Sequence, residues 1–186
     1  FFENKNNLTF FSLSPDLSNV SENVIVSGQN PDDQVSCIAK HLIENSTNKV
    51  LVVYHADKYG YVIRDSFLRY INNLGMSGSV YLDFFEVTNS TNLNEEIKRL
   101  SRFEERKARL KNLIKQVKAD DTIDLKEKKI QVRELERKLT LDTPFDSIIV
   151  ASDGDRLLEI LSHFAFYDIN SANTNIYGTS LWDDTE

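Results

Sequence analysis

Runs of apolar residues alternate with helical patterns along most of this sequence, and that alternation restricts the possible folds more than any other feature. The clearest run, Lys49–His55 (KVLVVYH), is apolar almost throughout, as expected of a parallel strand covered on both faces. Residues 31–45 before it and 61–75 after it place apolar side chains at steps of three and four, which is typical of amphipathic helices. Strands that alternate with such helices predict the α/β class, with a parallel sheet flanked by helices.

Other segments rich in apolar and β-branched residues are predicted strands on the same grounds. They are residues 8–14, 23–28, 79–87, 145–152 and 174–180. Ligands approach a parallel sheet at the carboxyl ends of its strands. The loops expected at those ends read YHADKYG, ASDGD and GTSLWDD, so we look for binding residues among them.

Residues 92–142 interrupt the alternation and differ in charge from the rest of the chain. This segment holds 15 of the 22 Lys and Arg residues and 11 of the 29 Asp and Glu residues, which gives it a net charge of +4 and leaves −11 on the remainder. Its apolar residues recur at helical spacing on both sides of a turn sequence, ADDT, at residues 119–122. The pattern predicts two long helices that form an antiparallel hairpin standing off the sheet.

Two interpretations of this hairpin stay open. It is either a solvated pair of helices whose charges keep it soluble, or a basic arm that binds a partner protein. A role in nucleic-acid binding is disfavoured, because acidic residues are interleaved and no aromatic platform is evident. For the second interpretation, the candidate contact residues fall on successive turns of one helix: Arg102, Arg106, Arg109 and Lys115.

The stretch SDGD, which includes Asp153 and Asp155, also has two interpretations. Carboxylates after a buried strand are typical of metal-dependent phosphoryl transfer. Alternatively, Ser152 or Asp153 caps the following helix and Asp155 lies in its first turn. The large residues Arg156 and Leu157, which stand where small or hydroxyl residues usually follow a catalytic pair, favour the helix start. We find no glycine-rich phosphate loop and no His spacing typical of metal ligands, so we predict no enzyme activity, metal or cofactor.

The length of 186 residues suggests one domain, or one domain with an appendage. No apolar run approaches the ~18 residues that a transmembrane helix requires. The chain opens on Phe1 and Phe2 rather than on Met, and we interpret it as a piece of a longer protein.

Two parts of the sequence resemble known families. Residues 23–75 resemble the second lobe of type I periplasmic binding proteins of the leucine/isoleucine/valine-binding kind. There a strand, an Asp-x-Gln helix start, a second strand and an Asp-x-x-Tyr-Gly loop follow in order, and here the loop is Asp57-Lys58-Tyr59-Gly60, one residue shorter. Residues 145–184, with DGDRL, YDI and GTSLWDD, look like the alphaproteobacterial penicillin-binding-protein activators, a lipoprotein branch of the same fold.

The resemblance implies one lobe of a noncatalytic periplasmic protein. Residues 1–22 would cross from a missing lobe, and residues 23–186 would form the present lobe with the 92–142 hairpin inserted. By this resemblance the intact protein is an outer-membrane-anchored lipoprotein in the periplasm, whose only membrane contact is a lipid anchor outside this fragment.

The resemblance also implies which residues face the interlobe cleft. Tyr59 matches a loop tyrosine that lines the cleft in amino-acid-binding relatives, and the other candidates surround it at the strand ends: Asp57, Gly60, Asp153, Gly154, Ser180 and Trp182. The expected function is regulation of peptidoglycan synthesis through contacts with an envelope protein such as a penicillin-binding protein. The alternatives are the solute-binding component of an amino-acid ABC transporter, with a small amino-acid-like ligand, and, third, a metal-dependent phosphatase.

Overall fold

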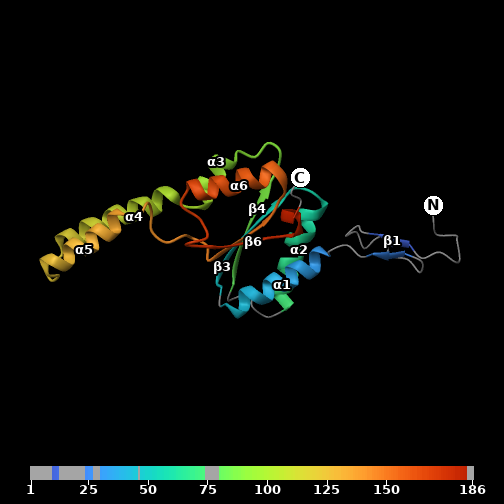
Figure 1. Ribbon diagram of the computed structural model, residues 1–186, viewed down its shortest axis with the longest axis horizontal. Coiled ribbons are helices and arrows are strands. Elements are labelled where there is room, and N and C mark those ends of the chain that lie inside the picture. The colour runs from blue at the N-terminus through green and yellow to red at the C-terminus, as the bar shows by residue number, and fades with distance from the viewer. Residues whose placement is uncertain (1–9, 13–23, 27–29, 46, 74–79, 184–186) are drawn as a thin grey trace.

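The computed structural model of the chain describes residues 10–12, 24–26, 30–45, 47–73 and 80–183, and its elements follow the predicted α/β order (Figure 1). The strands are β1 Phe10–Ser12, β2 Val24–Val26, β3 Lys49–His55, β4 Tyr81–Val87, β5 Ser147–Ala151 and β6 Asn175–Gly178. The α-helices are α1 Pro31–Glu44, α2 Lys58–Asn73, α3 Leu93–Leu100, α4 Phe103–Ala119, α5 Leu125–Glu136 and α6 Gly154–Phe166. A short 3₁₀ helix, η2, covers Ser180–Asp183.

Four strands form the main sheet in the order β4-β3-β5-β6, and every pair in it is parallel. This confirms the predicted parallel sheet flanked by helices. The segment at 23–28 differs from a simple alternation, because β2 pairs in parallel with β1 in a separate two-stranded sheet. The predicted crossover at residues 1–22 lies outside the described residues, apart from β1.

The sheet has a hydrophobic core on each face, and β3 supplies alternate residues to both. Val50 and Val52 face α1 and α2, whereas Leu51 and Val53 face α3 and α6. In Figure 1, α3 and α6 lie on one side of the sheet and α1 and α2 on the other. Each fully buried aliphatic side chain of this kind contributes about 1.5–3 kcal/mol to folding. The helix residues that complete the two cores are Val35, Ala39, Leu42, Ile63, Phe67, Ile71, Leu93, Ile97, Leu157, Ile160 and Phe164.

The start of α1 follows from local chemistry. The Asn30 side chain accepts a hydrogen bond from the Asp32 amide at 3.1 Å, and Pro31 occupies the first helical position. Asp32 and Asp33 lie in the first turn, where the helix dipole favours negative charge.

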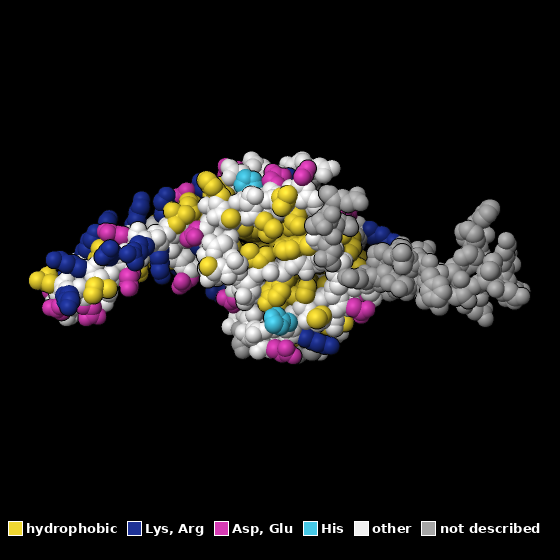
Figure 2. Space-filling model, in the orientation of Figure 1, with side chains coloured by type: hydrophobic (Ala, Val, Ile, Leu, Met, Phe, Trp, Pro, Cys, Tyr) yellow, Lys and Arg dark blue, Asp and Glu magenta, His cyan; other side chains and the backbone are white. Residues whose placement is uncertain are grey.

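The hairpin consists of α4 and α5, which extend away from the sheet (Figure 1) and carry many of the Lys and Arg side chains in Figure 2. Its bounds differ from the prediction. Instead of one long first helix there are two, because Arg102 adopts a left-handed backbone conformation with φ 50° between α3 and α4. Leu93 and Ile97 of α3 are buried against the sheet, so α3 belongs to the domain core rather than to the arm. Within the described residues, no helix is both long and apolar enough to cross a membrane.

Candidate functional site

The seven predicted cleft residues follow β3, β5 and β6, which are neighbours in the sheet. Because the strands are parallel, their carboxyl ends meet at one edge, and the three loops lie there in a row. We call this the carboxyl edge.

The turn from β3 into α2 is shaped by Asp57 and by Gly60 in the first turn of α2. The Asp57 carboxylate accepts a hydrogen bond from the Gly60 amide at 2.7 Å. A Cβ at Gly60 would lie 2.0 Å from the carbonyl oxygen of His55, so the close approach of the chain requires glycine here. The Tyr59 hydroxyl is buried and has no hydrogen-bond partner among the described residues, while its ring packs against the core under α1 and α2.

The ends of β3 and β5 are joined by a side-chain hydrogen bond. His55 Nε2 lies 2.7 Å from Ser152 Oγ, and Ser152 is fully buried. Ser152 therefore does not cap α6. Asp153, the second of the two predicted candidates, occupies the N-cap position, although its side chain accepts no capping hydrogen bond. The exposed Gly154 follows with φ +49° and open space around the position of its missing Cβ.

The chain after β6 is held by three hydrogen bonds. Gln34 at the start of α1 donates to Ser180 Oγ at 2.9 Å and accepts from the Ser180 amide at 2.8 Å. The indole N–H of Trp182 donates to the carbonyl of Val150 at 2.9 Å. The polar groups of Ser180 and Trp182 are thus already used in closing the carboxyl edge, and a ligand would have to compete for them.

A hollow of about 540 Å³ opens between the ends of β3 and β4. Of the predicted cleft residues only Asp57 lines it. His55 and residues of the β4–α3 connection complete the wall: Ala56, Val87, Thr88, Asn89 and Ser90. With one carboxylate, one imidazole and several small hydroxyl or amide groups, the hollow suits a small polar ligand.

The two aspartates of SDGD are exposed, and the described residues hold no group of three or more His, Cys, Asp or Glu side chains placed to bind one metal ion. Divalent cations need several oxygen ligands. Asp153 lies at the N-cap position of α6, and Asp155 lies in its first turn.

Arg106, a predicted partner contact, is instead buried at the base of the hairpin with 0% of its surface exposed. Its guanidinium donates to five backbone carbonyls at 3.0–3.4 Å: those of Ser101, Leu141, Asp142, Tyr167 and Asp168. Burial lowers the pKa of Arg106, and the Asp168 carboxylate 3.9 Å away offsets part of that effect. The prediction that Arg106 contacts a partner is wrong, because these carbonyls enclose its charge.

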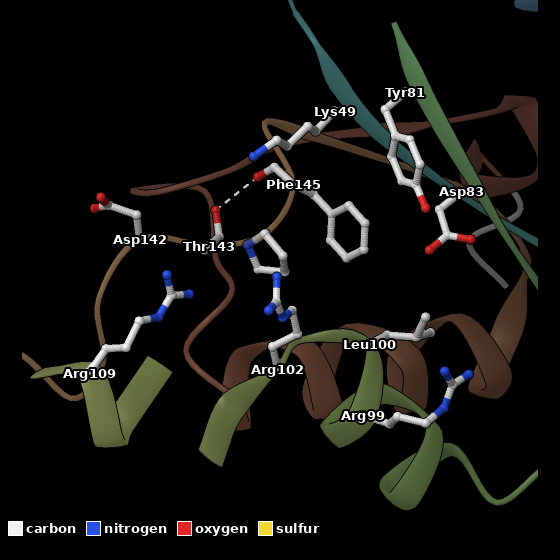
Figure 3. A pocket seen from close by; sticks show the side chains of 11 residues that line it. Lys49, Tyr81, Asp83, Arg99, Leu100, Arg102, Arg109, Asp142, Thr143 and Phe145 are labelled. Atoms are coloured by element: carbon white, nitrogen blue, oxygen red, sulfur yellow. Dashed lines mark hydrogen bonds between the residues drawn. The ribbon is translucent and has the colours of Figure 1, made fainter. Parts of the chain in front are cut away.

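A second hollow, of about 610 Å³, lies beside the hairpin base at the amino ends of β3 and β4. Figure 3 shows Arg99, Arg102 and Arg109 rising from the helices toward Lys49 and Tyr81 on the strands. The arginines are paired on their own helices. Arg99 contacts Glu96 at 2.8 Å, and Arg102 and Arg109 contact the same Glu105 at 2.6 and 3.8 Å.

Three residues that organise these regions were not among the predicted site residues: Gln34, His55 and Ser152. Gln34 carries a signal, because it is the glutamine of the Asp-x-Gln helix start. His55 and Ser152 each end a strand, and only the pairing of β3 with β5 brings them together. The enclosure of Arg106 leaves no mark in the sequence, since all five of its acceptors are backbone groups.

No protein-family model and no curated protein matches the chain. Among solved structures, an ABC transporter substrate-binding protein from Desulfitobacterium hafniense matches with a TM-score of 0.56 and 17% identity, over 95% of this chain and 40% of that chain. A solute-binding protein from R. palustris, in complex with 4-hydroxybenzoate, matches with a TM-score of 0.52 and 11% identity, over 86% of this chain and 32% of that chain.

The C-domain of LpoA from Haemophilus influenzae, a regulator of PBP1A, matches with a TM-score of 0.44 and 12% identity, over 91% of this chain and 38% of that chain. The chain thus spans less than half the length of each of these proteins. The two matches with higher TM-scores confirm the predicted fold, one lobe of the type I periplasmic-binding kind.

Proposed function

We propose that this chain is a noncatalytic lobe of a periplasmic protein that regulates peptidoglycan synthesis through contacts made by its α4–α5 hairpin. The observation that carries the proposal is the hairpin itself. Within α5, all of which the structure describes, no side chain is buried, so this helix adds almost nothing to the domain core. The base of the arm is nevertheless held firmly by the buried Arg106.

An arm that is anchored at its base and solvated along its length suits a contact surface better than a core element. The net charge of +4 over residues 92–142, on a chain that is otherwise acidic, can steer an acidic partner and set its orientation. The link to cell-wall synthesis comes from the resemblance of residues 145–184 to penicillin-binding-protein activators. On this proposal the intact protein is periplasmic and held at the outer membrane by a lipid attached outside these residues.

The test removes the outer part of the arm and leaves its anchor intact. Residues 112–133 are replaced by a short Gly-Ser linker, which keeps Arg106 and Leu110 in place. The purified chain and this variant are then compared for binding to the periplasmic domains of the host's penicillin-binding proteins, by biolayer interferometry. We expect binding by the intact chain and its loss in the variant. Equal binding by both forms, with the variant still melting cooperatively, would refute the role of the hairpin.

A second function, that of a solute-binding component, is favoured by one observation. The hollow between the ends of β3 and β4 has a size and polarity suited to a small ligand, and it lies at the carboxyl edge. One of the similar solved structures is an ABC transporter substrate-binding protein from Desulfitobacterium hafniense in complex with Leu. On this alternative, Asp57 and Tyr59 would contribute to one side of an amino-acid site, with Asp153, Gly154, Ser180 and Trp182 along the same edge.

A further inference from the structure

The outward face of α5 carries a row of basic side chains that lies opposite α4, the helix against which α5 packs. At 3.6 residues per turn, the partly buried Gln131, Val132 and Leu135 face α4. A second set falls within roughly 100° of arc on the other side of the helix. We call this set the α5 stripe, and all its members are exposed: Lys126, Lys129, Ile130, Arg133 and Arg137.

The cations of the α5 stripe are uncompensated. Among the described residues, none of its four basic side chains forms an ion pair. Arg102 before α4 and Arg109 and Lys118 on it each contact a glutamate, although Lys111 and Lys115 on α4 are exposed and form none among the described residues. Two acidic side chains beside the stripe interact with residues outside it. Glu136 pairs with Lys118 at 2.9 Å, and Glu127 accepts a hydrogen bond from Gln131 at 3.1 Å.

The stripe also contains one apolar residue. Ile130 is 51% exposed and lies between Lys126 and Arg133 on the same face. From residue 126 to residue 137 the stripe is about 16 Å long, because a helix rises about 1.5 Å per residue. Four positive charges around one exposed isoleucine over this length match an element of similar length that bears closely spaced carboxylates beside an apolar residue.

We propose that the α5 stripe is the docking surface for an acidic segment of a partner protein. This proposal rests on the function proposed above and specifies which face of the hairpin acts and what chemistry it recognises. Carboxylates spaced three and four residues apart on the partner would pair with Lys126, Lys129, Arg133 and Arg137, and an apolar side chain would cover Ile130. The predicted contacts Arg102 and Arg109 are less suited to this role, because they share the carboxylate of Glu105, whereas the basic side chains of the α5 stripe have no acidic partner among the described residues.

A membrane surface fits the stripe less well. Helices that lie in a lipid interface present a broad apolar face with large side chains. Here a single isoleucine is exposed on the stripe, and the acidic residues Glu127 and Glu134 adjoin it. A second copy of this chain, whose remaining surface is acidic, is distinguished from another protein by the test below.

The test compares two matched double substitutions in the full 186-residue chain. The stripe variant is Lys129→Gln with Arg133→Gln, and the control, which removes the same charge, is Lys40→Gln on α1 with Lys111→Gln on α4. All four residues are exposed and have no ion pair within the described part of the chain. Glutamine keeps helix propensity close to that of lysine and arginine, so both variants should fold alike. Circular dichroism and thermal melting check this.

Two probes are used, so that failure of this proposal is distinguished from failure of the proposed function. The first is the set of periplasmic domains of the penicillin-binding proteins. The second is a synthetic helical peptide with glutamates at i, i+4 and i+7 and a leucine beside them. Its binding is measured by fluorescence anisotropy. For both probes we expect the affinity of the stripe variant to fall about tenfold relative to the intact chain. The affinity of the control should change less than about twofold. Binding should weaken as salt rises from about 50 to about 300 mM.

The other outcomes overturn either this proposal or the function on which it rests. Equal losses in the two variants would mean that only overall charge matters. If the penicillin-binding-protein domains bind and the stripe variant binds as tightly as the intact chain, the partner docks elsewhere and the proposed function stands alone. Failure of those domains to bind refutes the proposed function, and the peptide then still tests the stripe. Loss of anionic-vesicle binding, or of self-association in ultracentrifugation, in the stripe variant would replace the protein partner by a membrane or by a second copy.

Discussion

Arg106 joins three parts of the chain that are far apart in sequence: the α3–α4 junction, the segment after α5 and the end of α6. A buried arginine is tolerated only when its donors are satisfied, and here five backbone carbonyls accept from it. The acceptors in turn depend on the arginine. Without it, buried carbonyls at the hairpin base lose their partner, at about 1–3 kcal/mol for each group left unsatisfied.

We therefore expect Arg106→Ala to lower the free energy of unfolding by about 3–5 kcal/mol. The control is Arg102→Ala, four residues earlier and exposed, which loses a surface pair with Glu105 and should cost less than about 1 kcal/mol. Urea denaturation followed by circular dichroism measures both. If the two variants lose equal stability, the carbonyl cage is not the anchor of the hairpin.

Two glycines of the carboxyl edge differ in the reason for which glycine is needed. At Gly60 an added Cβ would collide with the His55 carbonyl, while Gly154 has open space but a left-handed φ of +49°. Gly154→Ala should cost about 1–2 kcal/mol, the penalty of a left-handed residue. Gly60→Ala should cost about 3 kcal/mol, because the backbone itself must move. Thermal melting of the two variants checks which substitution costs more stability. A smaller loss for Gly60→Ala than for Gly154→Ala would contradict the close approach of Gly60 to the His55 carbonyl.

At the level of elements, α5 and α6 illustrate two kinds of helix. α6 buries Leu157, Ile160 and Phe164 against the sheet, whereas α5 packs against α4 and buries no side chain. Helix stability in proteins comes mainly from tertiary packing of one face. The two helices have nearly the same length, 13 and 12 residues, but they differ in how much of their surface packs against the rest of the chain.

Amide hydrogen exchange should reveal this difference without any substitution. We expect the amides of α5 to exchange through local opening, at free energies well below that of global unfolding, and those at the centre of α6 to exchange only on global unfolding. Mass spectrometry of peptides from residues 125–136 and 154–166 measures both. Equal protection would mean that the hairpin belongs to the cooperative core.

The elements that the sequence predicted are those whose pattern is local. The buried run of β3, the caps of α1 and the existence of a hairpin followed from residue type and spacing. The break at Arg102 did not, because the apolar steps of α3 continue into α4 without interruption and hide a single left-handed residue. The contact between His55 and Ser152 depends on strand pairing, and the burial of Arg106 depends on carbonyls up to 62 residues away.

At the scale of the whole molecule, the fold bears on ligand affinity. Binding proteins that close around a ligand bury most of its surface between two lobes. This chain spans 40% of the length of the Desulfitobacterium hafniense protein, and one lobe supplies about half of such contacts. Each tenfold change in affinity corresponds to about 1.4 kcal/mol of binding free energy. A loss of about 4 kcal/mol therefore raises the dissociation constant of a ligand from micromolar to millimolar.

We expect calorimetry to detect no binding of leucine, or of other amino acids, by this chain at micromolar concentrations. The fold of the sample is verified by its melting curve before each titration. Tight binding that disappears in Tyr59→Ala would contradict this expectation and favour the solute-binding function.

The anchored hairpin also has a mechanical consequence. α4 has 17 residues and is about 25 Å long, so the arm acts as a lever whose fulcrum is the guanidinium of Arg106. A tilt of about 5° at the fulcrum would displace the far end by about 2 Å over that length. Arg106 donates hydrogen bonds to the carbonyls of Tyr167 and Asp168, where the chain leaves α6 and turns toward β6. We therefore expect a force applied at the far end of the hairpin to act on the turn that leads into β6, the last strand of the sheet.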